Sequence, residues 1–144
     1  MVQLHARAAG VDEVRPTHDV AALIDVLAAG VSMAGITAAL TARGFDVVEP
    51  GWPESPAHRL GRDDDVIDVL VADHLPRHAQ PRLRRHPVMA VDGGAQALSR
   101  TQQVVIEHWG GTVELTVPDL LGALVLGCTV PTWARALIVL GHRI

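Results

Sequence analysis

Two aspartates stand inside separate apolar runs of this sequence. Asp19 lies in the run Thr17–Val26, and Asp68 lies in the later run Val66–Val71. Apolar runs of this length are typical of buried strands, and we expect the two strands to be neighbours in one sheet. Carboxylate oxygens are ligands that magnesium prefers, and magnesium ions can clamp the attacking and leaving oxygens of a phosphoryl transfer. The two aspartates therefore predict a magnesium-dependent phosphoryl-transfer site.

Ala21 limits the strength of that prediction. Alternate residues of a strand share a face, so Ala21 stands where an Asp-x-Asp motif would place its second carboxylate beside Asp19. Burying a carboxylate is costly unless it is paired, which favours a functional reason for Asp68. Two structural alternatives stay open: Asp19 as a turn or strand-edge residue after Pro16, and Asp68 as a buried carboxylate held by an arginine.

An arginine-rich segment, residues 75–87, follows directly after the second acidic strand. It contains Arg77, Arg82, Arg84 and Arg85. Guanidinium groups bind phosphate through paired hydrogen bonds, so these side chains are candidates for contacts with substrate phosphates beside the metal. The alternative is a solvated surface loop, which is the commoner role of such segments.

The order of these landmarks resembles the nucleotidyltransferase superfamily with the polymerase-β-like fold, in its branch of abortive-infection toxins. The stretch 15–20 is similar to the start of the family's acidic strand, and Asp68 is similar to its third carboxylate. Residues 117–126 are similar to the helix that follows the core sheet, and the resemblance covers residues 2–126.

The resemblance implies a reaction and a set of partners. A nucleoside triphosphate would donate a nucleotide to RNA or protein, and an antitoxin protein would be a further partner. Asp19 and Asp68 would be the catalytic residues and would hold magnesium, while the arginines of the 77–85 segment would attend the nucleotide phosphates or the acceptor.

Three features depart from the family pattern. Residues 1–5 resemble the middle of the family's first helix, so its glycine pair is missing, and Ala21 replaces the second carboxylate. From Gly127 onward the sequence diverges, and we expect a nucleotidyltransferase-like domain at 1–126 with a divergent tail at 127–144. A lost start and a shifted reading frame would explain both ends. These departures predict little or no nucleotide transfer, and they favour a rival function: a non-catalytic member that binds a protein or nucleic-acid partner.

Composition narrows the function classes further. A chain of 144 residues with 49% hydrophobic content fits one domain, and a net charge of -4 disfavours a protein whose whole surface binds nucleic acid. All twelve basic residues are arginine, which excludes lysine nucleophiles and a phosphate-loop lysine. The single cysteine, Cys128, favours a reducing, cytoplasmic location. Asp119, Pro131 and Arg135 interrupt the apolar C-terminal region, so we expect no membrane segment.

The periodicity predicts an α/β fold: a small mixed sheet flanked by helices, forming a minimal nucleotidyltransferase-like core. Ser32 is expected to cap a helix over 32–43, and residues 102–107 and 112–117 are expected to pair as a hairpin through Gly110 and Gly111. Thr116 and Asp119 have the spacing of a capping box for a helix over 117–126.

Overall fold

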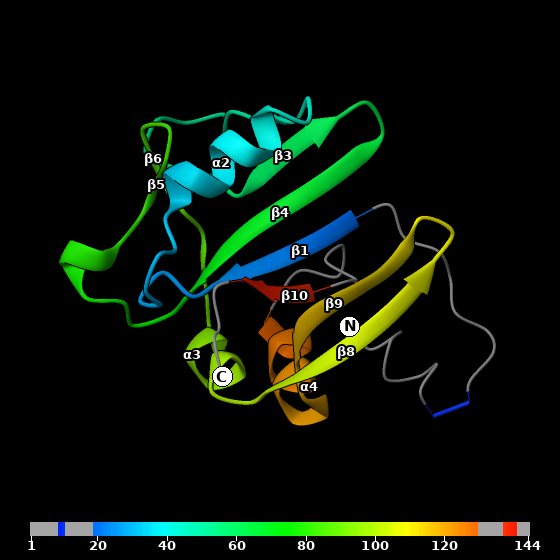
Figure 1. Ribbon diagram of the computed structural model, residues 1–144. Coiled ribbons are helices and arrows are strands. Elements are labelled where there is room, and N and C mark those ends of the chain that lie inside the picture. Colours follow the sequence, from blue (N-terminus) through cyan, green and yellow to red (C-terminus); the bar gives the residue numbers. More distant parts are fainter. Residues whose placement is uncertain (1–8, 11–18, 130–136, 141–144) are drawn as a thin grey trace.

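The fold is mixed α/β and rich in strands, as the computed structural model shows for residues 9–10, 19–129 and 137–140 (Figure 1). Within these residues the main sheet has eight strands in the order β2-β3-β4-β1-β10-β9-β8, with β7 beside β4. The strands are β1 (Asp19–Ile24), β2 (Asp46–Val47), β3 (Arg59–Arg62), β4 (Asp65–Ala72), β7 (Ala90–Val91), β8 (Thr101–His108), β9 (Gly111–Pro118) and β10 (Leu137–Leu140). A separate pair consists of β5 (Arg82–Leu83) and β6 (His86–Pro87). The helices are α2 (Met33–Thr41), α3 (Gly94–Leu98) and α4 (Leu120–Thr129), with a 3-10 turn, η1, at Arg77–Ala79.

The centre of the sheet is parallel and its two flanks are antiparallel. β1 pairs in parallel with β4 on one side and with β10 on the other, and β7 continues the parallel set beside the end of β4. The chain adds β2 and β3 to one flank and the hairpin β8–β9 to the other, all antiparallel. The predicted mixed sheet and the predicted hairpin are confirmed. The helices are short, and the fold consists mainly of strands.

Both faces of β1 are buried, against different cores. Ala21 and Leu23 belong to a cluster that includes Ala97 of α3 and Leu126 of α4. The intervening Ala22 and Ile24 belong to a second cluster, with Met33 of α2. Figure 1 shows α2 on one side of the sheet, and α3 and α4 on the other. Burial on both faces explains why β1 is apolar without a break from Val20 to Ile24, since apolar and polar alternation is typical of strands exposed on one face.

The helix starts show one prediction confirmed and one wrong. Ser32 caps α2, its Oγ accepting a hydrogen bond from the Gly35 amide at 3.1 Å. The capping box at Thr116 is wrong, because β9 continues through Pro118 and keeps Thr116 inside the strand. Asp119 caps α4 instead, with Oδ1 accepting from the Gly122 amide at 2.8 Å.

The C-terminal residues that the structure describes belong to the sheet. α4 runs to Thr129, across the predicted boundary at residue 126, and β10 pairs with both β1 and β9. Val139 of β10 is buried in the same cluster as Leu23 of β1. None of the helices in the described residues is long and apolar enough to cross a membrane.

The close approach of α3 to β4 is testable by substitution of Gly94. A Cβ at Gly94 would lie 2.8 Å from the Cα of Ala72, a backbone atom that cannot rotate away. We expect Gly94→Ala to lower the free energy of unfolding by about 1–3 kcal/mol, the usual cost of overpacking. Gly51→Ala is the control, because nothing lies within 4 Å of that Cβ position. Equal urea midpoints for the two variants would show that α3 does not pack too closely against β4 to accept a Cβ at position 94.

Candidate functional site

Asp68 lies in the middle of β4, between strands β1 and β3. The register pairs Asp68 with Ala21 on β1 and with Arg59 on β3. Asp19 pairs with Val66, two positions before Ala21 along β1, and its side chain lies outside the described part of the chain. The predicted adjacency of the two acidic strands is therefore confirmed. The structure also places the methyl group of Ala21 beside the Asp68 position.

Arg59 holds the buried carboxylate of Asp68 with two hydrogen bonds. Its Nε donates to Oδ1 at 2.9 Å, and its Nη2 donates to Oδ2 at 3.1 Å. The side chain of Asp68 is 1% exposed, and that of Arg59 is 35% exposed. Planar guanidinium and carboxylate groups match in this forked geometry, which is stronger and more specific than a single contact. Both oxygens of Asp68 thus have a cationic partner within the fold, as the ion-pair alternative supposed.

His58 completes the polar group around Asp68. Its Nε2 lies 3.9 Å from Oδ1 of Asp68. Burial lowers the pKa of His58 below its ordinary value, and the positive charge of Arg59 lowers it further, while the negative charge of Asp68 acts in the opposite direction. The imidazole is therefore favoured in its neutral form, and the charge of Asp68 is balanced by Arg59.

The described residues do not form a two-metal centre. Among them, no three histidine, cysteine, aspartate or glutamate side chains are grouped so that they could hold a metal ion. Asp68 is bound to a guanidinium through both oxygens, and Ala21 has no ligand atom to offer. A magnesium ion at Asp68 would compete with the positive charge of Arg59. Magnesium at Asp19 and Asp68 stays a prediction, and no reaction step is derived through it.

The arginines of the 75–87 segment have structural partners of their own. Arg82 donates from Nε and Nη2 to the carbonyl oxygen of Arg85, at 3.0 and 2.7 Å. Arg84 donates from Nη1 to Oε1 of Glu49 at 2.7 Å, and Oε2 of the same glutamate lies 2.9 Å from Nε2 of the buried His86. The hydrogen bond from Arg84 is the main cause that lowers the pKa of Glu49. These contacts attach the β5–β6 hairpin to the segment after β2.

The hairpin and Asp68 lie on opposite faces of the sheet. Leu83 of the hairpin packs in the cluster under α2, together with Val69. Asp68 alternates with Val69 along β4 and so points to the other face, where Leu70 packs with residues of α3 and α4. The structure therefore does not bring Arg82, Arg84 and Arg85 beside Asp68. Arg77 lies apart from them on η1 and is exposed.

Sequence reasoning did not identify Arg59 or His58 as the groups around Asp68. Arg59 is nine residues from Asp68, and the antiparallel register of β3 and β4 brings the two together. The sequence carried one available signal: a hairpin with a two-residue turn at Asp63 and Asp64 pairs residue 59 with residue 68. A buried carboxylate opposite an arginine in such a hairpin is a candidate ion pair.

Comparison of the chain with protein families, curated proteins and solved structures finds no match. The resemblance to nucleotidyltransferases rests on the sequence landmarks.

Without the Arg59 guanidinium, Asp68 would be a buried charge with no cation beside it, and the fold should be less stable. We expect Arg59→Met to lower the free energy of unfolding by about 3 kcal/mol, at the low end for breaking a buried pair because Arg59 is partly exposed. The double variant Arg59→Met, Asp68→Leu should recover most of the loss, since it leaves no unpaired charge. A double variant as unstable as Arg59→Met alone, by urea denaturation, would contradict the ion-pair interpretation.

The lowered pKa of His58 predicts a specific pH dependence of stability. Its unfolded form titrates near the ordinary value of 6.5, and its folded form takes up a proton only at lower pH. The unfolded chain therefore binds more protons below about pH 6.5, so the free energy of unfolding should fall as pH falls through that window. His58→Gln should flatten this slope, whereas His78→Gln, at an exposed position, should keep it. An unchanged slope in His58→Gln would contradict the assignment.

Proposed function

We propose that this chain is a cytoplasmic nucleotidyltransferase-like protein of the toxin–antitoxin type, with a minimal nucleotidyltransferase core. The activity implied is magnesium-dependent transfer of a nucleotide from a nucleoside triphosphate to RNA or protein. The observation that supports the proposal is the parallel pairing of β1 and β4, which puts Asp19 and Asp68 on adjacent strands, two register positions apart. A magnesium-assisted transfer of this kind needs carboxylates gathered in one place, and adjacent strands can bring them together.

We expect the activity of the chain as it stands to be weak or absent. Arg59 already supplies the positive charge that Asp68 needs, so a metal ion would have to compete with an ion pair that is in place. The register partner of Asp68 is Ala21, which offers no oxygen to bridge a second ion. The arginine hairpin lies on the other face of the sheet, so it does not supplement the charge at this position.

A non-catalytic function is the second candidate, and the same ion pair favours it. An Asp68 held by Arg59 and packed beside Ala21 is a stable part of the fold that needs no metal. In this case the protein would act by binding RNA or an antitoxin protein. Arg82 and Arg85 are exposed on the hairpin beside α2 and give this otherwise acidic chain a local basic surface.

Restoring the missing carboxylate tests the two candidates. We expect Ala21→Asp to raise magnesium affinity, because the new carboxylate lies beside Asp68 on the neighbouring strand. The variant should be less stable without metal, since Ala21 is fully buried and the two negative charges repel. Ala22→Asp is the matched control, because Ala22 is equally central in β1 but belongs to the cluster on the opposite face. Calorimetric magnesium titration of each form measures the affinity.

The outcome assigns the function. A gain in magnesium affinity for Ala21→Asp that is lost again when Asp68→Asn is added supports a magnesium site of the nucleotidyltransferase type. Transfer of labelled nucleotide from a triphosphate, compared between the two forms, then shows whether the site is catalytic. If Ala21→Asp binds magnesium no better than Ala22→Asp, the carboxylates form no metal site, and the partner-binding function is preferred.

A further inference from the structure

A cavity of about 420 Å³ opens where β1 and β4 end. We call it the carboxyl-edge pocket, and define it by six of its lining residues: Asp25, Leu27, Asp73, His74, Leu98 and Ser99. Its volume lies within the range of small-molecule sites, which are mostly apolar with a few polar groups. This pocket is separate from Asp68, whose position is in the middle of β4.

The place of the pocket in the topology favours a ligand. β1 and β4 are parallel and end side by side, so the chain leaves both strands at the same edge of the sheet. After β1 the chain forms α2 on one face, whereas α3 lies on the other face and lines the pocket with Ala95 and Leu98. In open α/β sheets, ligands bind in the crevice outside the carboxyl ends of the strands.

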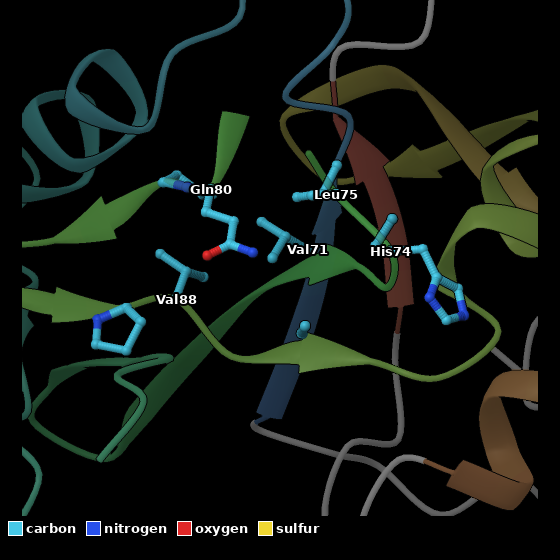
Figure 2. Close-up of a pocket in the computed structure, with 9 residues that line it drawn as sticks. Val71, His74, Leu75, Gln80 and Val88 are labelled. Atoms are coloured by element: carbon cyan, nitrogen blue, oxygen red, sulfur yellow. The ribbon is translucent and has the colours of Figure 1, made fainter. Parts of the chain in front are cut away.

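A second, smaller hollow adjoins the pocket across residues 72–75. It measures about 210 Å³ and shares Ala72, His74 and Leu75 with the carboxyl-edge pocket. Figure 2 shows the side chains of Val71, Leu75, Gln80 and Val88 gathered around this smaller hollow, with the ring of His74 lying apart from them. The segment after β4 therefore forms a common wall of the two hollows.

The charges that line the carboxyl-edge pocket are negative. Asp73 accepts hydrogen bonds from the amides of Ala95 at 3.0 Å and Gly93 at 2.9 Å, which lower the pKa of its carboxyl group and keep it ionised. Asp25 adds a second carboxylate, whose Oδ1 accepts from the amide of Leu27 at 3.1 Å. Among the described residues that line it, none is arginine, and His74 is the only one able to become cationic. Such a field disfavours phosphates and carboxylates.

We propose that the carboxyl-edge pocket binds a small organic cation, an ammonium group carried on a short apolar chain. The apolar part of the ligand contacts Leu27 and Leu98, and its ammonium group lies toward Asp25. Leu27 is 64% exposed, so a ligand in the pocket would remove apolar surface from water. The inference is independent of the nucleotide function, because a polyanionic triphosphate is the wrong charge for this pocket.

Titration with three probes of equal length tests the proposal: hexylammonium, hexan-1-ol and hexanoate. Amide chemical shifts of the isotope-labelled protein report the affinity, the place of binding and the folding of each variant. We expect hexylammonium to shift the amides of residues 25–27, 73–75 and 95–99, and hexanoate to bind at least about tenfold more weakly, which corresponds to about 1.4 kcal/mol. Hexan-1-ol should lie between them.

Two pairs of variants locate the site. Ala95→Phe fills the pocket from an exposed helix position and should abolish binding, while Gln96→Phe, next to it and outside the lining, should not. Asp25→Asn should weaken hexylammonium binding about two- to fivefold, while Asp64→Asn, in the exposed turn between β3 and β4, should leave it unchanged. The proposal is overturned if wild-type protein does not bind hexylammonium, if hexanoate binds as well, or if binding survives Ala95→Phe. Should that variant fail to fold, an unchanged affinity in Asp25→Asn overturns it.

Discussion

A carboxylate in the dry centre of a sheet must have a cation within reach, and Asp68 obtains one from the neighbouring strand. β3 supplies Arg59 on one side, and β1 supplies only the methyl group of Ala21 on the other. A one-residue slip between β3 and β4 would turn Arg59 to the opposite face and leave Asp68 unpaired. The ion pair thus fixes the register of β3 on β4. Through β4 it also fixes how the flank formed by β2 and β3 meets the parallel centre.

The same constraint limits what the acidic strands can do. The pair Arg59–Asp68 satisfies both oxygens of the carboxylate, and a metal ion must compete with a partner that is already in place. Proteins retain buried ion pairs at a cost in desolvation, and removing one member is worse than removing both. For the function proposed above, this pair and the methyl group of Ala21 at its side predict little of the chemistry.

The sheet separates three surfaces with different character. The face under α2 carries the arginine hairpin, which Glu49 anchors through Arg84 and His86. The opposite face holds Asp68 with α3 and α4. The carboxyl edge holds an apolar pocket with two carboxylates, and β1 and β4 contribute to all three regions. Residues close together in the sequence after β4 therefore belong to different regions: residues 73–76 line the pocket, and residues 82–87 form the hairpin on the α2 face.

The sequence by itself determined the features that depend on a few neighbouring residues. The apolar runs predicted β1 and β4, Ser32 predicted the start of α2, and the glycine pair at 110 and 111 predicted the β8–β9 hairpin, whose turn lies at 109 and 110. The tertiary structure alone decided the partner of Asp68, the face of the arginine hairpin and the place of β10 between β1 and β9. It also decided that Asp119 rather than Thr116 caps α4, because pairing with β8 continues β9 for two residues beyond Thr116, to Pro118. Periodicity and capping act over one or two turns of chain, whereas ion pairs, strand order and cavities depend on contacts between distant segments, and packing of the whole sheet sets their geometry.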